Sequence, residues 1–206
     1  MFAKSRYWLI IDEVNTAGEN QEMQFNFHTP CSMKEIEDGF VSMEKPGFLI
    51  KQDRRGAPDV QISKSKGYAS LGGLPNEPTH REIDWLVFSK ALKGIRQSDR
   101  MATLIYPFDS IETVVPSEVS VEQLDLKDDA AVGYLVSAKG RQDFVIVSDG
   151  KFRRFTDNIA GDFTCARISL TDRGIDYAGF TQVSKFSITG MKVHSFPAKR
   201  DFEYLK

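Results

Sequence analysis

Cysteine is scarce in this chain, which has only two among its 206 residues. Cys31 and Cys165 stand far apart, and neither lies in the C-x-x-C or Cys/His spacing of a metal or redox site. One disulfide between them stays open, but two separate free thiols, at least one of them buried, are the favoured interpretation. The sequence therefore predicts no metal ion and no cofactor.

Long hydrophobic runs are lacking as well. No apolar stretch approaches the ~18 residues that a transmembrane helix needs, so the sequence predicts no membrane partner. The first residues do not form a signal peptide, because Lys4 and Arg6 interrupt the apolar run Phe2–Ile11 and no small-residue cleavage site follows. The chain as given carries no targeting signal, and its localisation stays open.

The chain also lacks a large excess of positive or negative charge. The net charge is −2, and acidic and basic residues are mixed along the whole chain. No basic stripe marks a nucleic-acid surface, so the sequence predicts no nucleic-acid partner. A local cluster of bases on a nearly neutral protein can still bind a polyanion.

The chain also lacks any long stretch with the 3.6-residue period of an amphipathic helix. The best candidate for a single helical turn is Met33–Phe40. The chain is instead rich in residues that favour strands, including 15 phenylalanines. Short apolar or alternating runs recur between Gly, Pro, Asn and Asp residues. These runs are Arg6–Glu13, Gln21–His28, Gly47–Gln52, Ile83–Ala91, Met101–Phe108, Val119–Leu124, Ala131–Ala138, Gln142–Ser148, Asp162–Leu170, Ile175–Phe180, Lys185–Ile188 and Met191–Phe196.

So many strands with one apolar face each predict an all-β fold, because two such faces must pack together. We expect an antiparallel two-sheet β-sandwich of about a dozen strands, with a barrel as the alternative, in a single domain over residues 1–206. The first two runs and the turn Asn15–Asn20 predict an antiparallel hairpin. The span Asp53–Arg81 is predicted to be irregular, and a loop of that length is usually functional or mobile.

Several segments, taken in the order in which they occur in the chain, resemble segments of a known protein family. They are Tyr7–Glu13 followed by Gln24–His28, then Ser70–Ile83, Met101–Pro107, Asp143–Ser148, Thr164–Leu170 and Phe180–Val193. Together they resemble the C-terminal β-sandwich of heparinase II/III-like polysaccharide lyases over essentially the whole chain. The Tyr-Trp-hydrophobic-Asp and Thr-Leu-Ile-Tyr-Pro signatures carry most of this resemblance.

The resemblance implies an origin among enzymes that cleave uronate-containing polysaccharides, such as glycosaminoglycans or alginate, by β-elimination. Family members are typically periplasmic or secreted bacterial proteins, and they join an N-terminal (α/α) toroid to the sandwich. The toroid supplies a catalytic Tyr and an Asn or His, and the first sandwich strands supply an H-x-H-x-D-like segment that can also contribute to a zinc site. This chain has neither, and its three histidines are scattered.

Catalysis by β-elimination needs a base, a proton donor and a group that neutralises the uronate carboxylate. No set of residues in this sequence matches those roles. The first hypothesis is therefore a non-catalytic sandwich module of such a lyase. The second is a stand-alone carbohydrate-binding or structural sandwich, and the third, least favoured, is an independent enzyme.

The predicted partners are an acidic polysaccharide and, at the N-terminal edge beside Tyr7–Asp12, a toroid domain or another copy of the chain. An unpaired edge strand there would be prone to dimerise. Tyr7 and Trp8 are neighbours on a strand and should point to opposite faces, with one of them in the core.

The predicted substrate-binding residues are His28, Arg54, Arg55, His80 and Trp85. Aromatic rings suit the C–H faces of sugars, and guanidinium groups match carboxylate or sulfate.

Four of these residues also have an ordinary structural interpretation, which the sequence favours. Trp85 alternates into the apolar run Ile83–Ala91, which predicts a core position. His28 is interpreted as a surface or capping residue, and Arg54 and Arg55 as part of a solvated turn.

Overall fold

The structure is a computed structural model. It describes residues 2–3, 6–18, 21–53, 55, 59–70, 80–92, 94, 98–191 and 193–205, and for residues 2, 3, 69, 70, 80 and 81 it describes the backbone alone. The chain divides into two compact units, Met1–Ser117 and Glu118–Lys206. The single domain over residues 1–206 stays a prediction beside this division. Among the described helices, none is long and apolar enough to span a membrane.

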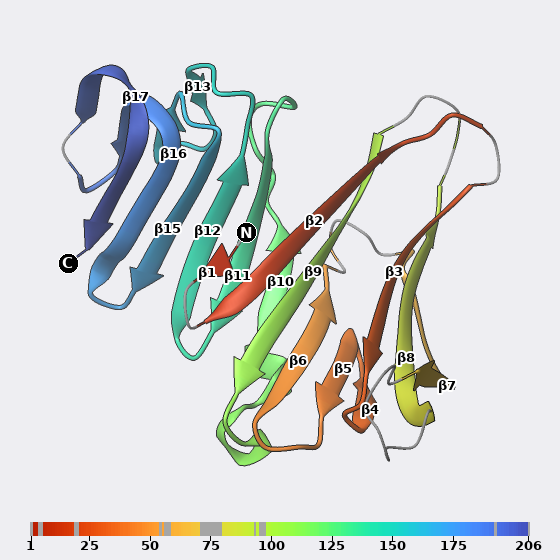
Figure 1. The fold of residues 1–206 in the computed structure, drawn as a ribbon. Coiled ribbons are helices and arrows are strands. Elements are labelled where there is room, and N and C mark those ends of the chain that lie inside the picture. The colour runs from red at the N-terminus through yellow and green to blue at the C-terminus, as the bar shows by residue number, and fades with distance from the viewer. Residues whose placement is uncertain are drawn as a thin grey trace. The chain divides into compact units, whose positions relative to one another are not determined.

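Unit 1 contains two antiparallel sheets (Figure 1). Its strands are β1 (Phe2–Ala3), β2 (Tyr7–Asn15), β3 (Glu22–Thr29), β4 (Met33–Ile36), β5 (Gly39–Ser42), β6 (Gly47–Gln52), β7 (Gln61–Ser70), β8 (His80–Ala91) and β9 (Ser98–Phe108). A six-stranded sheet has the order β1-β2-β9-β6-β5-β4, and a three-stranded sheet has the order β3-β8-β7. Short 3-10 turns follow at Ile111–Thr113 and Pro116–Glu118.

Unit 2 is built around one eight-stranded antiparallel sheet. Its strands are β10 (Ser120–Gln123), β11 (Val132–Ala138), β12 (Arg141–Val147), β13 (Arg153–Arg154), β14 (Ile159–Gly161), β15 (Cys165–Thr171), β16 (Gly174–Ile188) and β17 (His194–Leu205). The order is β10-β11-β12-β15-β16-β14-β13, and β17 pairs with β16 as well. The predicted all-β, antiparallel class is therefore confirmed.

The two sheets of unit 1 share one hydrophobic core. Phe40 and Ile50 come from the six-stranded sheet, and Leu86 and Phe88 come from the three-stranded sheet; all four side chains are fully buried. Phe40 meets Phe88 edge-on, with ring centroids 5.5 Å apart. Aromatic pairs in this geometry contribute beyond their buried area, so this contact helps to hold the two layers together.

A buried carboxylate also joins these layers. Asp84, on β8, is 1% exposed and accepts a hydrogen bond of 2.8 Å from the backbone amide of Met33, on β4. Its other oxygen forms an ion pair of 2.8 Å with Lys66, on β7. Burial disfavours the charge of Asp84, but the contacts with Lys66, Met33 and Lys64 together hold its pKa below the usual range.

The predicted hairpin between the first two strands is wrong. β2 pairs with β9, with Leu9 opposite Leu104, whereas β3 pairs with β8, with Phe25 opposite Phe88. β2 has apolar residues on both faces, and so does β9, which suits two adjacent strands inside a sheet. β3 has one polar face, and it therefore lies where that face can meet solvent.

The predicted helical turn at Met33–Phe40 is also wrong, because these residues form the β4–β5 hairpin. Met33 and Phe40 are buried in the core, which strand alternation allows and a single helical turn at the surface would not. Gly39 permits the close pairing of β5 with β6, since a Cβ there would lie 1.8 Å from the carbonyl oxygen of Ile50.

The span Asp53–Arg81 is less irregular than predicted, because β7 occupies ten of its residues. The alternating inward positions of β7 include Lys64 and Lys66, and of the strand's first residues Ile62 packs against the core. These lysines interact with Asp84, and Lys64 also donates to the carbonyl oxygen of Met33. Because charged residues occupy these inward positions, the sequence lacks the apolar alternation by which a strand is predicted.

In unit 2, β16 changes partners along its length. Its first part pairs with β15 up to Thr181, and its end pairs with β14 from Phe186. Gln182, between them, has a left-handed φ of 55°. The pairing register of β16 with β17 shifts at this point. Asp162 stabilises the irregular backbone, because it accepts hydrogen bonds of 2.8 Å from the backbone amides of Ser184 and Lys185.

Both cysteines are free thiols, as the sequence favours, but each is only partly buried, so the expectation of a fully buried thiol is wrong. Burial raises the pKa of Cys165 to about 11. The neutral thiol is therefore the stable form of this residue near neutral pH.

We expect Asp84→Ala to lower the free energy of unfolding of unit 1 by about 2–3 kcal/mol at pH 7, because buried hydrogen-bonding groups lose their partner. Since the pKa of Asp84 is lower in the folded state, this stabilisation is present above about pH 4 and is lost as the pH falls through the folded value. Urea unfolding followed by tryptophan fluorescence measures it, because Trp8 and Trp85 both lie in unit 1.

Glu82→Ala is the matched control. Glu82 pairs with the same Lys66 at 3.1 Å, but its side chain is 56% exposed. It should change stability very little. Equal effects of the two substitutions would contradict the structural role of Asp84.

Candidate functional site

One face of the three-stranded sheet packs on the core, and the other lies open. Strand alternation and the pairing register place nine side chains on the open side. This open face comprises Gln24, Asn26 and His28 from β3, Trp85, Val87 and Ser89 from β8, and Gln61, Ser63 and Ser65 from β7. Apart from Val87 and Ser89, which are partly buried, all of them are exposed.

A stack of two aromatic rings stands on the open face. The imidazole of His28 and the indole of Trp85 lie opposite each other across β3 and β8, with centroids 4.4 Å apart and planes inclined by 20°. The indole also lies against Gly67 of β7, where a Cβ would be 2.3 Å from Nε1. The glycine therefore makes the room that the indole occupies.

Trp85 is 38% exposed, which makes the prediction of a core position wrong. Its strand neighbour Ile83 is only 7% exposed. Alternation correctly places both on one face of β8, but it does not tell how far an indole projects from that face.

Most polar groups of the open face form no hydrogen bond with another described residue. Gln24 Nε2 donates a hydrogen bond of 2.8 Å to Glu22. Within the described part of the chain, the side chains of Asn26, Ser63 and Ser65 form no such bond. These amide and hydroxyl groups can each donate and accept, so they are available to a polar ligand.

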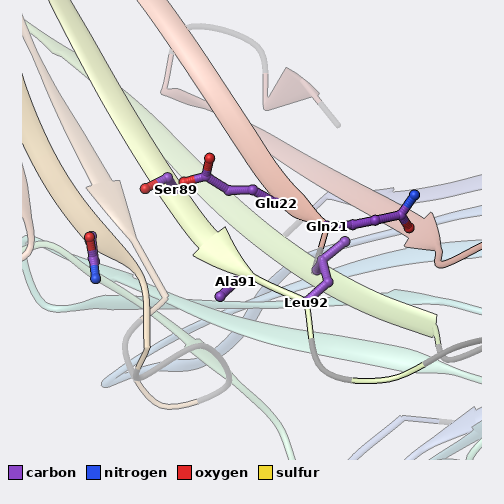
Figure 2. Close-up of a pocket in the computed structure, with 6 residues that line it drawn as sticks. Gln21, Glu22, Ser89, Ala91 and Leu92 are labelled. Carbon is purple, nitrogen blue, oxygen red and sulfur yellow. The ribbon is translucent and has the colours of Figure 1, made fainter. Parts of the chain in front are cut away.

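The open face ends in a hollow of about 300 Å³, lined by Gln21, Glu22, Gln61, Ser89, Ala91 and Leu92. Figure 2 shows the carboxylate of Glu22 extending toward Ser89 at this end of β8. Gln21, Glu22, Gln61 and Ser89 bring hydrogen-bonding groups to this hollow, which lies next to the amide of Gln24 that already contacts Glu22. It therefore continues the row of hydrogen-bonding groups beyond the aromatic stack.

Of the five residues predicted from the sequence, the structure brings His28 and Trp85 together. Arg55 is exposed and lies in a turn, where its backbone amide donates to Asp53 at 3.0 Å. His80 pairs with Ser70 at the start of β8, but its side chain lies outside the described part, as does all of Arg54.

Sequence reasoning missed the polar residues around the aromatic stack. Gln24 and Asn26 alternate with Phe25 and Phe27, and this alternation is the signal that could have identified them. Ser63 and Ser65 carried no such signal, because β7 itself was not predicted.

Unit 2 contains a second charged cluster, but its members bind one another. Asp143 is 1% exposed and pairs with Arg167 at 2.9 Å and with Arg141 at 3.3 Å. Arg167 also lies 4.8 Å above the ring of Tyr177. Burial and Glu203 raise the pKa of Tyr177, which makes it a poor base at neutral pH. We interpret this cluster as structural.

No group of three or more His, Cys, Asp or Glu side chains suited to a metal ion occurs among the described residues. Comparison with known protein families and with curated proteins finds no match for this chain.

We expect Gly67→Ala to displace the Trp85 indole, because the new methyl group cannot fit beside Nε1. In a Trp8→Phe background, where Trp85 is the single tryptophan, the fluorescence emission maximum should move to longer wavelength as the indole leaves its stack. Ser65→Ala, on the same strand and face, should leave the emission unchanged. An unchanged spectrum of the Gly67→Ala variant would contradict the described position of the indole.

Proposed function

We propose that this chain is a non-catalytic carbohydrate-binding protein, and that the open face of the three-stranded sheet is its binding surface. The observation that carries the proposal is the exposed stack of His28 and Trp85 among unused polar side chains. Sugars present apolar C–H groups on their ring faces and hydroxyl groups around their edges. An aromatic surface with amides and hydroxyls beside it complements both.

The row of binding groups is extended rather than enclosed. It runs from Ser65 and Trp85 along β8 to the hollow at Glu22 and Ser89. An open row of this kind suits the internal units of a polysaccharide chain, which must pass over the surface, better than a single small molecule enclosed in a pocket.

The described open face favours neutral sugar units. Its titratable groups are His28 and, at the hollow, Glu22, and a carboxylate repels the carboxylate of a uronate. The acidic polysaccharide predicted from the sequence depends on Arg54, Arg55 and His80, of which Arg55 alone has a described side chain. Binding of acidic sugar units at those residues stays a proposal beside the neutral one.

We also propose kinship with the sandwich of heparinase II/III-like lyases. The segments that carry the resemblance coincide with strands, since Tyr7–Asn15 is β2, Glu22–Thr29 is β3 and Ser98–Phe108 is β9. The two-sheet sandwich is proposed for unit 1, where the two sheets share a core. On this proposal the chain serves a lyase as a module that holds polysaccharide and performs no β-elimination itself.

We expect Trp85→Ala to weaken polysaccharide binding at least tenfold, which corresponds to about 1.4 kcal/mol, because it removes the larger ring of the stack. Affinity electrophoresis through gels that contain galactomannan, hydroxyethyl cellulose, alginate or heparin measures the binding. Asn26→Ala should weaken it less.

Trp8→Ala is the control, because Trp8 is 43% exposed but lies on β2 of the other sheet. It should bind polysaccharide as the wild type does. If none of the gels retards the wild type, or if both tryptophan variants lose binding equally, the proposed surface is wrong.

Incubation with heparin, heparan sulfate or alginate should release no unsaturated uronate, as followed by ultraviolet absorbance. The reason is that the described residues offer no base, proton donor and carboxylate-neutralising group in one place. A steady rise in absorbance that depends on protein concentration would overturn the non-catalytic proposal.

A further inference from the structure

The inner face of β2 carries the exposed Trp8 and the partly buried Ile10, Asp12 and Val14, which are separate from the open face. As expected from strand alternation, Tyr7 is 3% exposed, whereas its neighbour Trp8 is 43% exposed. Ile10, Asp12 and Val14 follow Trp8 on the same face of the strand. Asp12 lies opposite Met101 of β9, which belongs to the core of unit 1.

An apolar pocket of about 500 Å³ lies over this face. It is lined by Trp8 and Ile10 of β2, Phe27 of β3, Phe48 of β6 and Ile105 of β9, together with Pro46, Gly47 and Pro107. This volume lies in the range of pockets that hold ligand side chains or small molecules. An apolar group that enters it would be buried among aromatic and aliphatic side chains.

Asp12, two residues beyond Ile10, is a half-buried carboxylate. It forms no hydrogen bond or ion pair within the described part of the chain. Burial alone raises its pKa, since no described cation offsets the loss of water. A cation supplied by a partner would meet this charge.

Among the described strands, none pairs with the edge of β2 next to these side chains beyond Trp8. β1 covers only the start of the strand, opposite Tyr7 and Trp8. From Ile10 to Asn15, β2 has ladder pairs with β9 alone in the described structure. Main-chain groups on such an edge can pair with an added strand, and side-chain pockets beside the edge then select its sequence.

We propose that β2 binds an extended peptide segment of another protein, which adds a strand along Ile10–Asn15. A large apolar side chain of the peptide enters the pocket beside Ile10, and a Lys or Arg two residues away pairs with Asp12. Directly opposite residues of neighbouring strands point to the same face, which fixes this apolar-x-basic spacing. The paired edge belongs to the six-stranded sheet, whereas the carbohydrate surface is the outer face of the three-stranded sheet, so this proposal does not depend on the carbohydrate one.

The test uses two acetylated and amidated peptides, TLTKTVT for a parallel strand and TVTKTLT for an antiparallel one, with binding measured by NMR chemical-shift perturbation. One of them should bind and shift the amide signals of Ile10 to Asn15. Replacing its Lys by Glu, or its Leu by Ser, should weaken binding about threefold to tenfold. Asp12→Lys should reverse the preference, so that this variant binds the Glu peptide better than the Lys peptide.

N-methylated peptides test the strand pairing itself. Successive amides of a strand point to opposite edges, so methylation at the even-numbered positions blocks one edge and methylation at the odd-numbered positions blocks the other. One set should abolish binding and the other should leave it nearly unchanged. Trp85→Ala should bind the peptide as the wild type does, which separates this site from the carbohydrate surface.

Three results would overturn the proposal. The first is that neither peptide binds. The second is equal binding of the Lys and Glu peptides to the wild type, or equal loss with both methylation patterns. The third is a dimer of the chain in size-exclusion chromatography that Ile11→Lys converts to a monomer, because the edge would then belong to a second copy.

Discussion

The three-stranded sheet, and with it the candidate site, depends on the buried carboxylate of Asp84. This residue connects β8 to β7 through Lys66 and to β4 of the other sheet through the amide of Met33. A charge in such a place is stable only when its partners are fixed, so it specifies how the two layers meet. The next residue along β8 is Trp85, which alternation then turns to the open side.

The molecule uses its polar side chains in two ways. In Asp84, Asp143 and Asp162 the carboxylates are buried and bonded to partners within the chain, because an unpaired buried charge would be strongly destabilising. Among the described residues, Asn26, Ser63 and Ser65 on the open face and the half-buried Asp12 have no such partners. At these polar groups a ligand can add interactions that the folded chain does not already make.

The candidate site was predictable only in part. The alternation of Gln21–His28 indicated that His28 lies on a polar face, and the structure places it there. It could not indicate that Trp85 stacks on His28, because the register of β3 on β8 joins residues that are distant in the sequence. Ser63 and Ser65 escaped notice because Lys64 and Lys66 follow Ile62 at the inner positions of β7, which interrupts the hydrophobic alternation.

The sequence by itself determined the all-β class and the faces that residues of one strand share. These properties follow from short-range periodicity and composition, which any stretch of a few residues displays. Only the tertiary structure decided that β2 pairs with β9 and β3 with β8, and therefore which polar face stays open beside the indole of Trp85. Strand partners are chosen by the packing of whole apolar faces, and that packing involves residues that are far apart along the chain.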